Sequence, residues 1–178
     1  MSTEDFIAHL EKLGEQDRGA IATLRRSLGF PPGTYPPAYP HVERFVARDS
    51  SPHEGRRLAL YVLAALYARH PKAGGQSFAS AWGELARQPH RGDSIEKRFI
   101  ALLGADAENL PDYLRQAVSL LAADGIGLDY VALLRDLSLW LNSRLDPEIR
   151  DRIRQRWARD FYRALLPPAA ADTQDATH

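Results

Sequence analysis

Basic side chains are the residues of this chain whose types and spacing best suit a chemical role. Arg98, Arg115 and Arg135 have no acidic residue four positions away, where a helix would bring a neutralising carboxylate. A guanidinium group can bind two oxygens of a phosphate at once, which suits it to a nucleic-acid backbone. Lys97 and Arg144 join these three as candidates. From spacing alone, an ordinary solvated surface explains all five residues better than nucleic-acid binding does.

The charge of the chain is balanced overall but uneven along the sequence. The 178 residues include 23 basic and 23 acidic side chains, so the formal net charge is zero. This balance argues against a protein that binds polyanions with its whole surface. Between His53 and Gly104, however, basic residues outnumber acidic ones, which favours one basic face. The preference for arginine over lysine is weaker support, because a GC-rich genome also produces it.

The residues that most enzymes use are absent or scattered. Cysteine is absent, and none of the six histidines stands at a trusted metal-ligand spacing from another histidine or a carboxylate. The sequence has no HExxH, GxSxG or P-loop motif. We therefore predict a protein that is not an enzyme and that has no metal, cofactor or small-molecule substrate. A helical enzyme built from scattered carboxylates is a weaker alternative.

The elements that must position the basic residues are all predicted to be helices. Apolar residues recur at helical spacing in every strong pattern, and no segment alternates convincingly with period two. This favours an all-α fold of about eight helices in two packed bundles. We place an N-terminal bundle at residues 1–91, a C-terminal bundle at 92–166 and a disordered tail at 167–178.

The segment 93–104 carries Lys97 and Arg98 and is predicted to be a short helix with marked ends. Asp93 can accept hydrogen bonds from the first free backbone N–H groups, and Glu96 can reach back to complete a capping box. Gly104 suits a left-handed turn at the other end. In the same way, Asp129 and Asp146 are predicted to begin the last two helices.

Residues 30–40 contain five prolines and interrupt the helical pattern. This segment is predicted to be neither a helix nor a central strand, because proline lacks the N–H group that both require. Tyr35 and Tyr39 indicate a loop that is fixed to the body of the protein. Before it, Gly14 is expected to end the first helix, and a second helix is expected from about residue 16 to residue 28.

Targeting and membrane segments are not predicted. The acidic N-terminus leads into an amphipathic helix, unlike a signal peptide. No apolar run approaches the ~18 residues that a membrane span needs. We therefore expect a cytoplasmic protein that does not contact a membrane.

The order of several short motifs is similar to that of a known family. The motifs are Arg25-Arg26, Leu58 to His70, Ser94 to Leu103, Leu110 to Arg115, Leu128 to Tyr130, Leu133 to Leu137, Trp140 and Arg156 to Tyr162. Each is short and helix-like, so the specificity lies in their order and spacing. From Phe6 to about Tyr162, the chain resembles the CasB family, the small subunit of the type I-E CRISPR effector complex (Cascade). Tyr130 stands where the family pattern has tryptophan, and the proline-rich segment is the least similar part.

The resemblance implies two helical bundles and a role without catalysis. It implies a place in Cascade beside the backbone and large subunits and a second copy of itself, close to guide RNA and target DNA. There, a basic surface would stabilise the target and displaced strands of the R-loop through sequence-independent phosphate contacts. The residues carried over to this surface are Arg25, Arg26, Arg57, Arg91, Lys97, Arg98, Arg115, Arg135 and Arg144.

A helical protein-interaction module without nucleic-acid binding is the alternative hypothesis. In this interpretation the arginines are only a solvated surface, and the proline-rich segment or an apolar patch is the docking site. The two hypotheses differ in a measurable property, because only the first requires salt-dependent binding of a single strand of any sequence.

Overall fold

The computed structural model describes residues 2–167 of the chain. Within that range the chain forms nine α-helices, three 3-10 helices and no strand, which confirms the predicted all-α fold. The α-helices are α1 (Thr3–Gln16), α2 (Arg18–Arg26), α3 (Tyr39–Val42), α4 (Gly55–Arg69), α5 (Phe78–Ala86), α6 (Gly92–Leu103), α7 (Leu110–Ala123), α8 (Tyr130–Trp140) and α9 (Pro147–Leu165). The 3-10 helices are η1 (Ser27–Gly29), η2 (Pro36–Ala38) and η3 (Glu43–Phe45). Apart from Pro167, the predicted tail lies outside the described residues.

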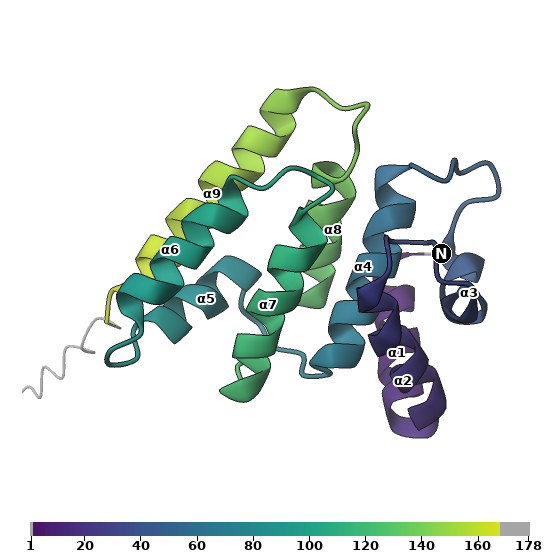
Figure 1. The fold of residues 1–178 in the computed structure, drawn as a ribbon, viewed down its shortest axis with the longest axis horizontal. Coiled ribbons are helices and arrows are strands. Elements are labelled where there is room, and N and C mark those ends of the chain that lie inside the picture. Colours follow the sequence, from purple (N-terminus) through teal and green to yellow (C-terminus); the bar gives the residue numbers. More distant parts are fainter. Residues whose placement is uncertain (1, 168–178) are drawn as a thin grey trace, which may run out of the picture.

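The helices form an elongated body with α4, α7 and α8 between its two ends (Figure 1). At one end lie α1, α2 and α3, and at the other lie α5, α6 and α9. α4 is buried along most of its length and packs mainly against α8 and α2. Among residues 2–167, no helix is both long and apolar enough to cross a membrane.

A single hydrophobic core runs through the body. The two most extensive helix contacts are α5 with α9 and α4 with α8, and each joins a helix before residue 91 to one after it. The backbone of α5 comes so close to α9 that a Cβ added at Gly83 would lie 2.6 Å from the Cβ of Ala164. The division into two bundles at residue 91 stays a prediction, and the packing across that point is extensive.

Two predicted helix starts are confirmed by their caps. Oδ1 of Asp129 accepts a hydrogen bond from the N–H of Ala132 at 2.9 Å and begins α8. Oδ1 of Asp146 accepts from the N–H of Glu148 at 2.9 Å and begins α9. Both caps satisfy backbone donors that have no partner within the helix, so these starts depend on local sequence alone.

The predicted caps of α6 are wrong, although the helix ends at Leu103 as predicted. The helix already begins at Gly92, and no side chain among residues 2–167 caps it. Asp93 therefore lies inside the first turn, where its charge still favours the helix dipole. Glu96 does not close a capping box, because it accepts a hydrogen bond from the hydroxyl of Tyr162 at 2.6 Å. Gly104 is right-handed, with a φ of −80°.

The first helix also ends later than predicted. α1 passes through Gly14 and continues to Gln16. The break comes at Asp17, whose Oδ1 accepts a hydrogen bond from the N–H of Ala20 at 2.8 Å and begins α2. A side-chain cap at this point therefore decides the boundary, and the glycine three positions earlier does not.

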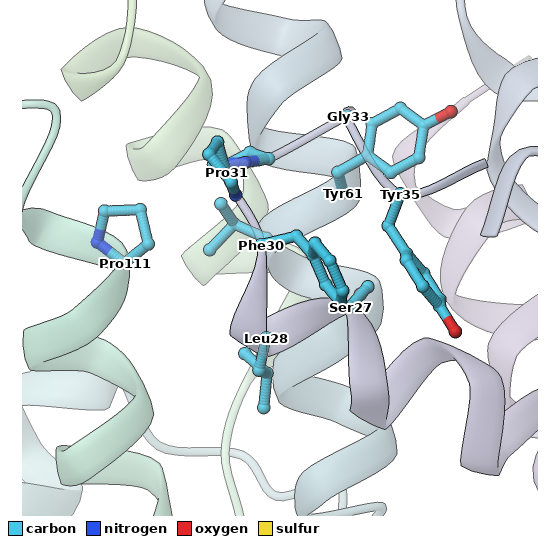
Figure 2. Close-up of a pocket in the computed structure, with 10 residues that line it drawn as sticks. Ser27, Leu28, Phe30, Pro31, Gly33, Tyr35, Tyr61 and Pro111 are labelled. Atoms are coloured by element: carbon cyan, nitrogen blue, oxygen red, sulfur yellow. The ribbon is translucent and has the colours of Figure 1, made fainter. Parts of the chain in front are cut away.

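The proline-rich segment is partly helical, contrary to the prediction. Pro36 begins η2 and Pro40 lies in the first turn of α3, where a missing N–H breaks no helical hydrogen bond. The predicted attachment to the body is confirmed, since Tyr35 and Tyr39 both pack against the core. Tyr35 also lies against Phe30, with ring centroids 4.6 Å apart (Figure 2).

Candidate nucleic-acid interface

Four arginines line one open groove with a volume of about 610 Å³. They come from four different helices, α2, α4, α6 and α7. We call this the arginine groove, and its lining residues are Arg25, Arg69, Arg98, Arg115, Leu28, Gly29, Gln116, Ser119 and Leu120. Over the part of the chain that the structure describes, no carboxylate is among these residues. The groove therefore presents positive charge with little local compensation.

Hydrogen bonds hold two of the groove arginines in place. Nε of Arg25 donates to the carbonyl oxygen of Ala68 at 3.0 Å, which links the end of α2 to α4. Nε of Arg69 donates to Oγ of Ser119 at 3.1 Å, which links α4 to α7. Because both bonds use Nε, the terminal nitrogens of both guanidinium groups remain available to an anion.

The other two groove arginines are more exposed. Arg115 forms a long ion pair with Asp112 at 3.6 Å, and their side chains are 46% and 66% exposed, so the pair is weak. Arg98 is exposed and forms no hydrogen bond or ion pair within residues 2–167. Guanidinium groups stay protonated at physiological pH, so all four remain cationic. Such a cluster attracts phosphate groups more strongly than it attracts single carboxylates.

Lys97 and Arg98 were predicted together, but the structure separates them. Successive residues of an α-helix point about 100° apart. Arg98 lines the arginine groove, whereas Lys97 lines a separate hollow of about 350 Å³ with Asp93, Glu96 and Ile100. Two carboxylates thus lie beside Lys97, and its charge is partly compensated.

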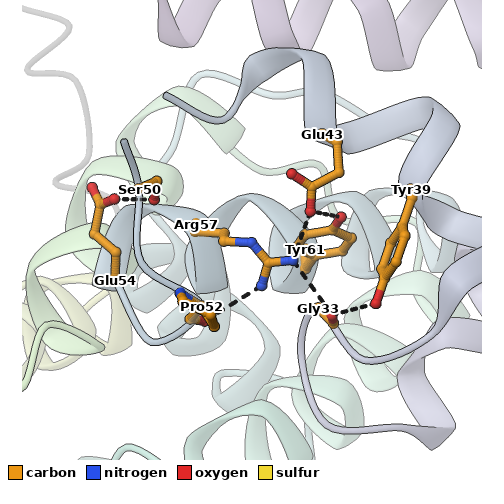
Figure 3. Close-up of polar contacts among 8 residues, drawn as sticks. All are labelled: Gly33, Tyr39, Glu43, Ser50, Pro52, Glu54, Arg57 and Tyr61. Atoms are coloured by element: carbon orange, nitrogen blue, oxygen red, sulfur yellow. Dashed lines mark hydrogen bonds and ion pairs between the residues drawn. The ribbon is translucent and has the colours of Figure 1, made fainter. Parts of the chain in front are cut away.

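Arg57 is engaged in a network that fixes the proline-rich segment to α4 (Figure 3). Its Nη2 lies 2.6 Å from Oε1 of Glu43, and the hydroxyl of Tyr61 donates to the same oxygen at 2.6 Å. The guanidinium also donates to the carbonyl oxygens of Gly33 and Pro52. Only 14% of the Arg57 side chain is exposed, so little of its charge reaches the surface.

The same network shifts two pKa values. Partial burial raises the pKa of Glu43, but the hydrogen bonds from Tyr61 and Arg57 outweigh burial and leave this pKa below its ordinary value. Burial and the neighbouring Glu43 carboxylate raise the pKa of Tyr61. At neutral pH, Glu43 is therefore charged and Tyr61 is a hydroxyl donor, which is the combination that holds the network together.

The remaining predicted residues do not line the arginine groove. Arg26 and Arg144 are exposed, and their side chains form no hydrogen bond or ion pair over residues 2–167. Arg91 pairs with Asp124, and Arg135 pairs with Glu4 at 3.0 Å. Of the nine predicted residues, the structure thus gathers Arg25, Arg98 and Arg115.

Arg69 is a groove residue that the sequence prediction missed. It stands in the last turn of α4, where a basic residue is also explained by the helix dipole. The sequence feature that could have identified Arg69 is the excess of basic residues from His53 to Gly104, because Arg69 is one of them. No three histidine, aspartate or glutamate side chains gather into a possible metal site among residues 2–167.

Residues 20–162 match a family described as CRISPR-associated protein Cse2. This range covers most of the chain and includes all four groove arginines. The chain belongs to the Cse2 family. The predicted resemblance to the small CRISPR subunit is thereby confirmed. The Cse2 match includes α3 to α8 in full and most of α2 and α9.

Cse2 relatives match nearly the whole chain. CRISPR-associated protein Cse2 of Thermus thermophilus is 42% identical over 167 residues, which is 90% of each chain. The crystal structure of CasB from Thermus thermophilus has a TM-score of 0.75 and 41% identity over 91% of this chain and 99% of that one. A chain of a CRISPR RNA-guided surveillance complex shares the fold, with a TM-score of 0.75 and 22% identity over 92% of both chains.

Proposed function

We propose that this Cse2 protein is a non-catalytic small subunit of a CRISPR surveillance complex (Cascade). Its role is to stabilise the target and displaced DNA strands of the R-loop through a basic surface, in cytoplasmic defence against viruses. The arginine groove is the observation that carries this proposal, because four cationic side chains and no carboxylate of residues 2–167 line it. The Cse2 family match and the shared fold of a surveillance-complex chain support it.

The chemistry of the groove suits the phosphate backbone of either strand. Guanidinium groups bind phosphates without regard to base sequence, which is what a subunit needs if its complex meets many targets. Formation of an R-loop exchanges one duplex for another of similar stability. A few phosphate contacts to the separated strands can therefore shift this exchange toward the open state.

The rest of the surface is proposed to contact protein and guide RNA. A net charge of zero leaves much of the surface without a strong positive potential, which suits contacts with other Cascade subunits and a second copy of the chain. Ile100 and Leu139 are large apolar side chains that are 51% and 42% exposed, and they are candidates for such contacts.

The test is a fluorescence-anisotropy titration of the full chain with a labelled single strand of arbitrary sequence, repeated across salt concentrations. The variant Arg69→Gln/Arg98→Gln removes two charges from the groove. We expect its affinity to fall roughly tenfold or more, because charge-assisted hydrogen bonds are lost. The slope of log affinity against log salt should also fall by about 0.7 for each phosphate contact removed.

The matched control is Arg152→Gln/Arg159→Gln, which removes the same charge from exposed positions on α9. We expect this variant to bind like the unmodified protein. Equal losses in both double variants would mean that only net charge matters and would contradict the groove as the site. If neither variant changes a measurable affinity, the strand binds elsewhere and the groove is not the site. If no strand binds even at low salt, the interaction-module alternative is favoured.

A further inference from the structure

Phe30 is an exposed aromatic side chain beside the arginine groove. The residue is 49% exposed. It directly follows Gly29, which lines the groove. A single exposed apolar residue is common on protein surfaces and needs no function. Phe30, however, lies beside a cluster of arginines and packs against Tyr35, and these two features suggest a specific role.

Leu28 and Gly29 line the arginine groove and directly precede Phe30 in the chain. Leu28 lines both the arginine groove and a smaller hollow that includes Phe30. Between Leu28 and Phe30, a Cβ added at Gly29 would meet no atom of the described chain within 4 Å, so the backbone there is open to a ligand. A flexible strand lying in the groove can therefore pass over Gly29 toward the ring.

The ring of Phe30 is held in place before any ligand arrives. Tyr35 lies against it with an interplanar angle of 22°, so one side of the ring is supported (Figure 2). Pro31 and Pro32 restrict the backbone that follows, and the N–H of Thr34 closes a turn on the carbonyl oxygen of Pro31 at 3.1 Å. A ring fixed in this way loses little conformational entropy when it binds.

We propose that Phe30 stacks on one base of a single strand whose phosphates lie in the arginine groove. This inference rests on the proposed function and names the form of nucleic acid that the groove accepts. Every base has an aromatic face, so stacking tolerates any sequence and suits the sequence-independent phosphate contacts. In a duplex the bases are stacked on one another and do not reach Phe30. The groove therefore selects separated DNA or RNA strands.

The test compares Phe30→Ala, Phe30→Leu and Phe30→Trp in the full chain, with labelled single-stranded DNA, single-stranded RNA and duplex DNA. Phe30→Leu keeps an apolar side chain without a flat ring, and Phe30→Trp keeps a flat ring. We expect the alanine and leucine variants to bind single strands about tenfold more weakly and the tryptophan variant to bind them normally. The salt slope should stay unchanged, because no phosphate contact is removed. Duplex affinity should be the same in all variants.

A direct signal comes from Phe30→Trp. The indole fluorescence of this variant should be quenched further by a bound single strand than the fluorescence of the unmodified protein, whose three tryptophans are buried. Thermal melting of each variant checks that the chain is folded. If the Phe30 variants lose the same affinity for DNA and RNA strands, the ring stacks on the base without regard to the sugar. If they lose more affinity for one of the two, the site favours that kind of strand.

The outcomes separate the two proposals. Suppose that the unmodified protein binds single strands with an affinity that falls with salt, and that all three Phe30 variants bind equally well. Then the stacking proposal is wrong, but the proposed binding of phosphates in the arginine groove is unaffected. Binding by Phe30→Leu equal to that of the unmodified protein would show apolar contact in place of stacking. A loss of duplex binding equal to the loss of single-strand binding would also overturn the inference. If no nucleic acid binds, both proposals fail.

Discussion

Arg57 and Arg98 carry the same charge in different surroundings. Arg57 is largely buried and shares Glu43 with Tyr61, whereas Arg98 is exposed in the arginine groove. To bind a phosphate, Arg57 would first have to lose its ion pair, but Arg98 would lose only water. Glu43 lies 14 positions from Arg57 in the sequence, so helical spacing does not reveal this pairing.

Neighbouring substitutions test this difference at α6. We expect Arg98→Gln to weaken single-strand binding and to reduce the salt slope by about 0.7. Lys97→Gln removes the same charge one residue away, beside Asp93 and Glu96, and should leave both quantities nearly unchanged. Anisotropy titrations across salt measure both. Equal effects at the two positions would show that the groove does not define the binding surface.

The network around Glu43 predicts a pH-dependent stability. The pKa of Glu43 is lowered from 4.5 in the folded protein, so its contribution is fully present above that value and is lost as pH falls through the lower folded pKa. Glu43→Gln should therefore reduce the free energy of unfolding by about 1 kcal/mol at pH 7 and by less near pH 3. Urea unfolding at both pH values measures the difference.

Glu148→Gln is the matched control for this prediction. Glu148 pairs with Arg152, but both side chains are about three-quarters exposed, so this pair contributes little. We expect the control variant to unfold like the unmodified protein at pH 7. An effect of Glu43→Gln that is the same at pH 7 and pH 3 would show that the ion pair is not its cause.

At the scale of helices, the sequence best predicts those boundaries that depend only on a few adjacent residues. Asp129 and Asp146 were identified as helix starts because a cap needs only its own side chain and the next few N–H groups. Asp93 has the same local pattern, but α6 begins before it, at Gly92. The turn that precedes α6 contains His90 with a φ of 66°, a backbone conformation that the sequence does not specify.

The two aspartates should differ in their effect on stability. Asp129→Ala removes a cap from α8 and should lower the free energy of unfolding by about 1 kcal/mol. Asp93→Ala removes only a favourable charge from the first turn of α6, so we expect a loss below about 0.5 kcal/mol. Chemical denaturation of both variants measures this. A larger loss at Asp93 would mean that it caps α6 in solution.

The arginine groove lies beyond what helix patterns predict. Its arginines come from four helices, and the bond between Arg69 and Ser119 joins positions 50 residues apart. Three of these residues were among the nine candidates from the sequence and the family resemblance, but nothing in the sequence separated them from the other six. Only the packing of α2, α4, α6 and α7 does that, and this packing depends on the shapes of buried side chains.

At the scale of the whole molecule, the packing joins both halves of the chain. α4 packs on α8 and α5 packs on α9, so neither half buries its own apolar surface completely. We therefore expect the full chain to unfold in one cooperative transition, with equal calorimetric and van't Hoff enthalpies. Fragment 1–91 alone should lack a cooperative transition. Two separate transitions in the full chain would instead support independent bundles.

The pairing of α5 with α9 also has a consequence for synthesis of the protein. Ser77, which caps α5, donates a hydrogen bond to Asp160 of α9, 83 residues further along the chain. Trp82 of α5 also packs on Phe99 of α6, but Phe78 packs on Trp157 of α9, with ring centroids 5.0 Å apart. This part of α5 therefore lacks its main partner until the ribosome has nearly finished the chain. We therefore expect a chain that stops before α9 to expose this surface and to be bound by chaperones or degraded more readily than the full chain.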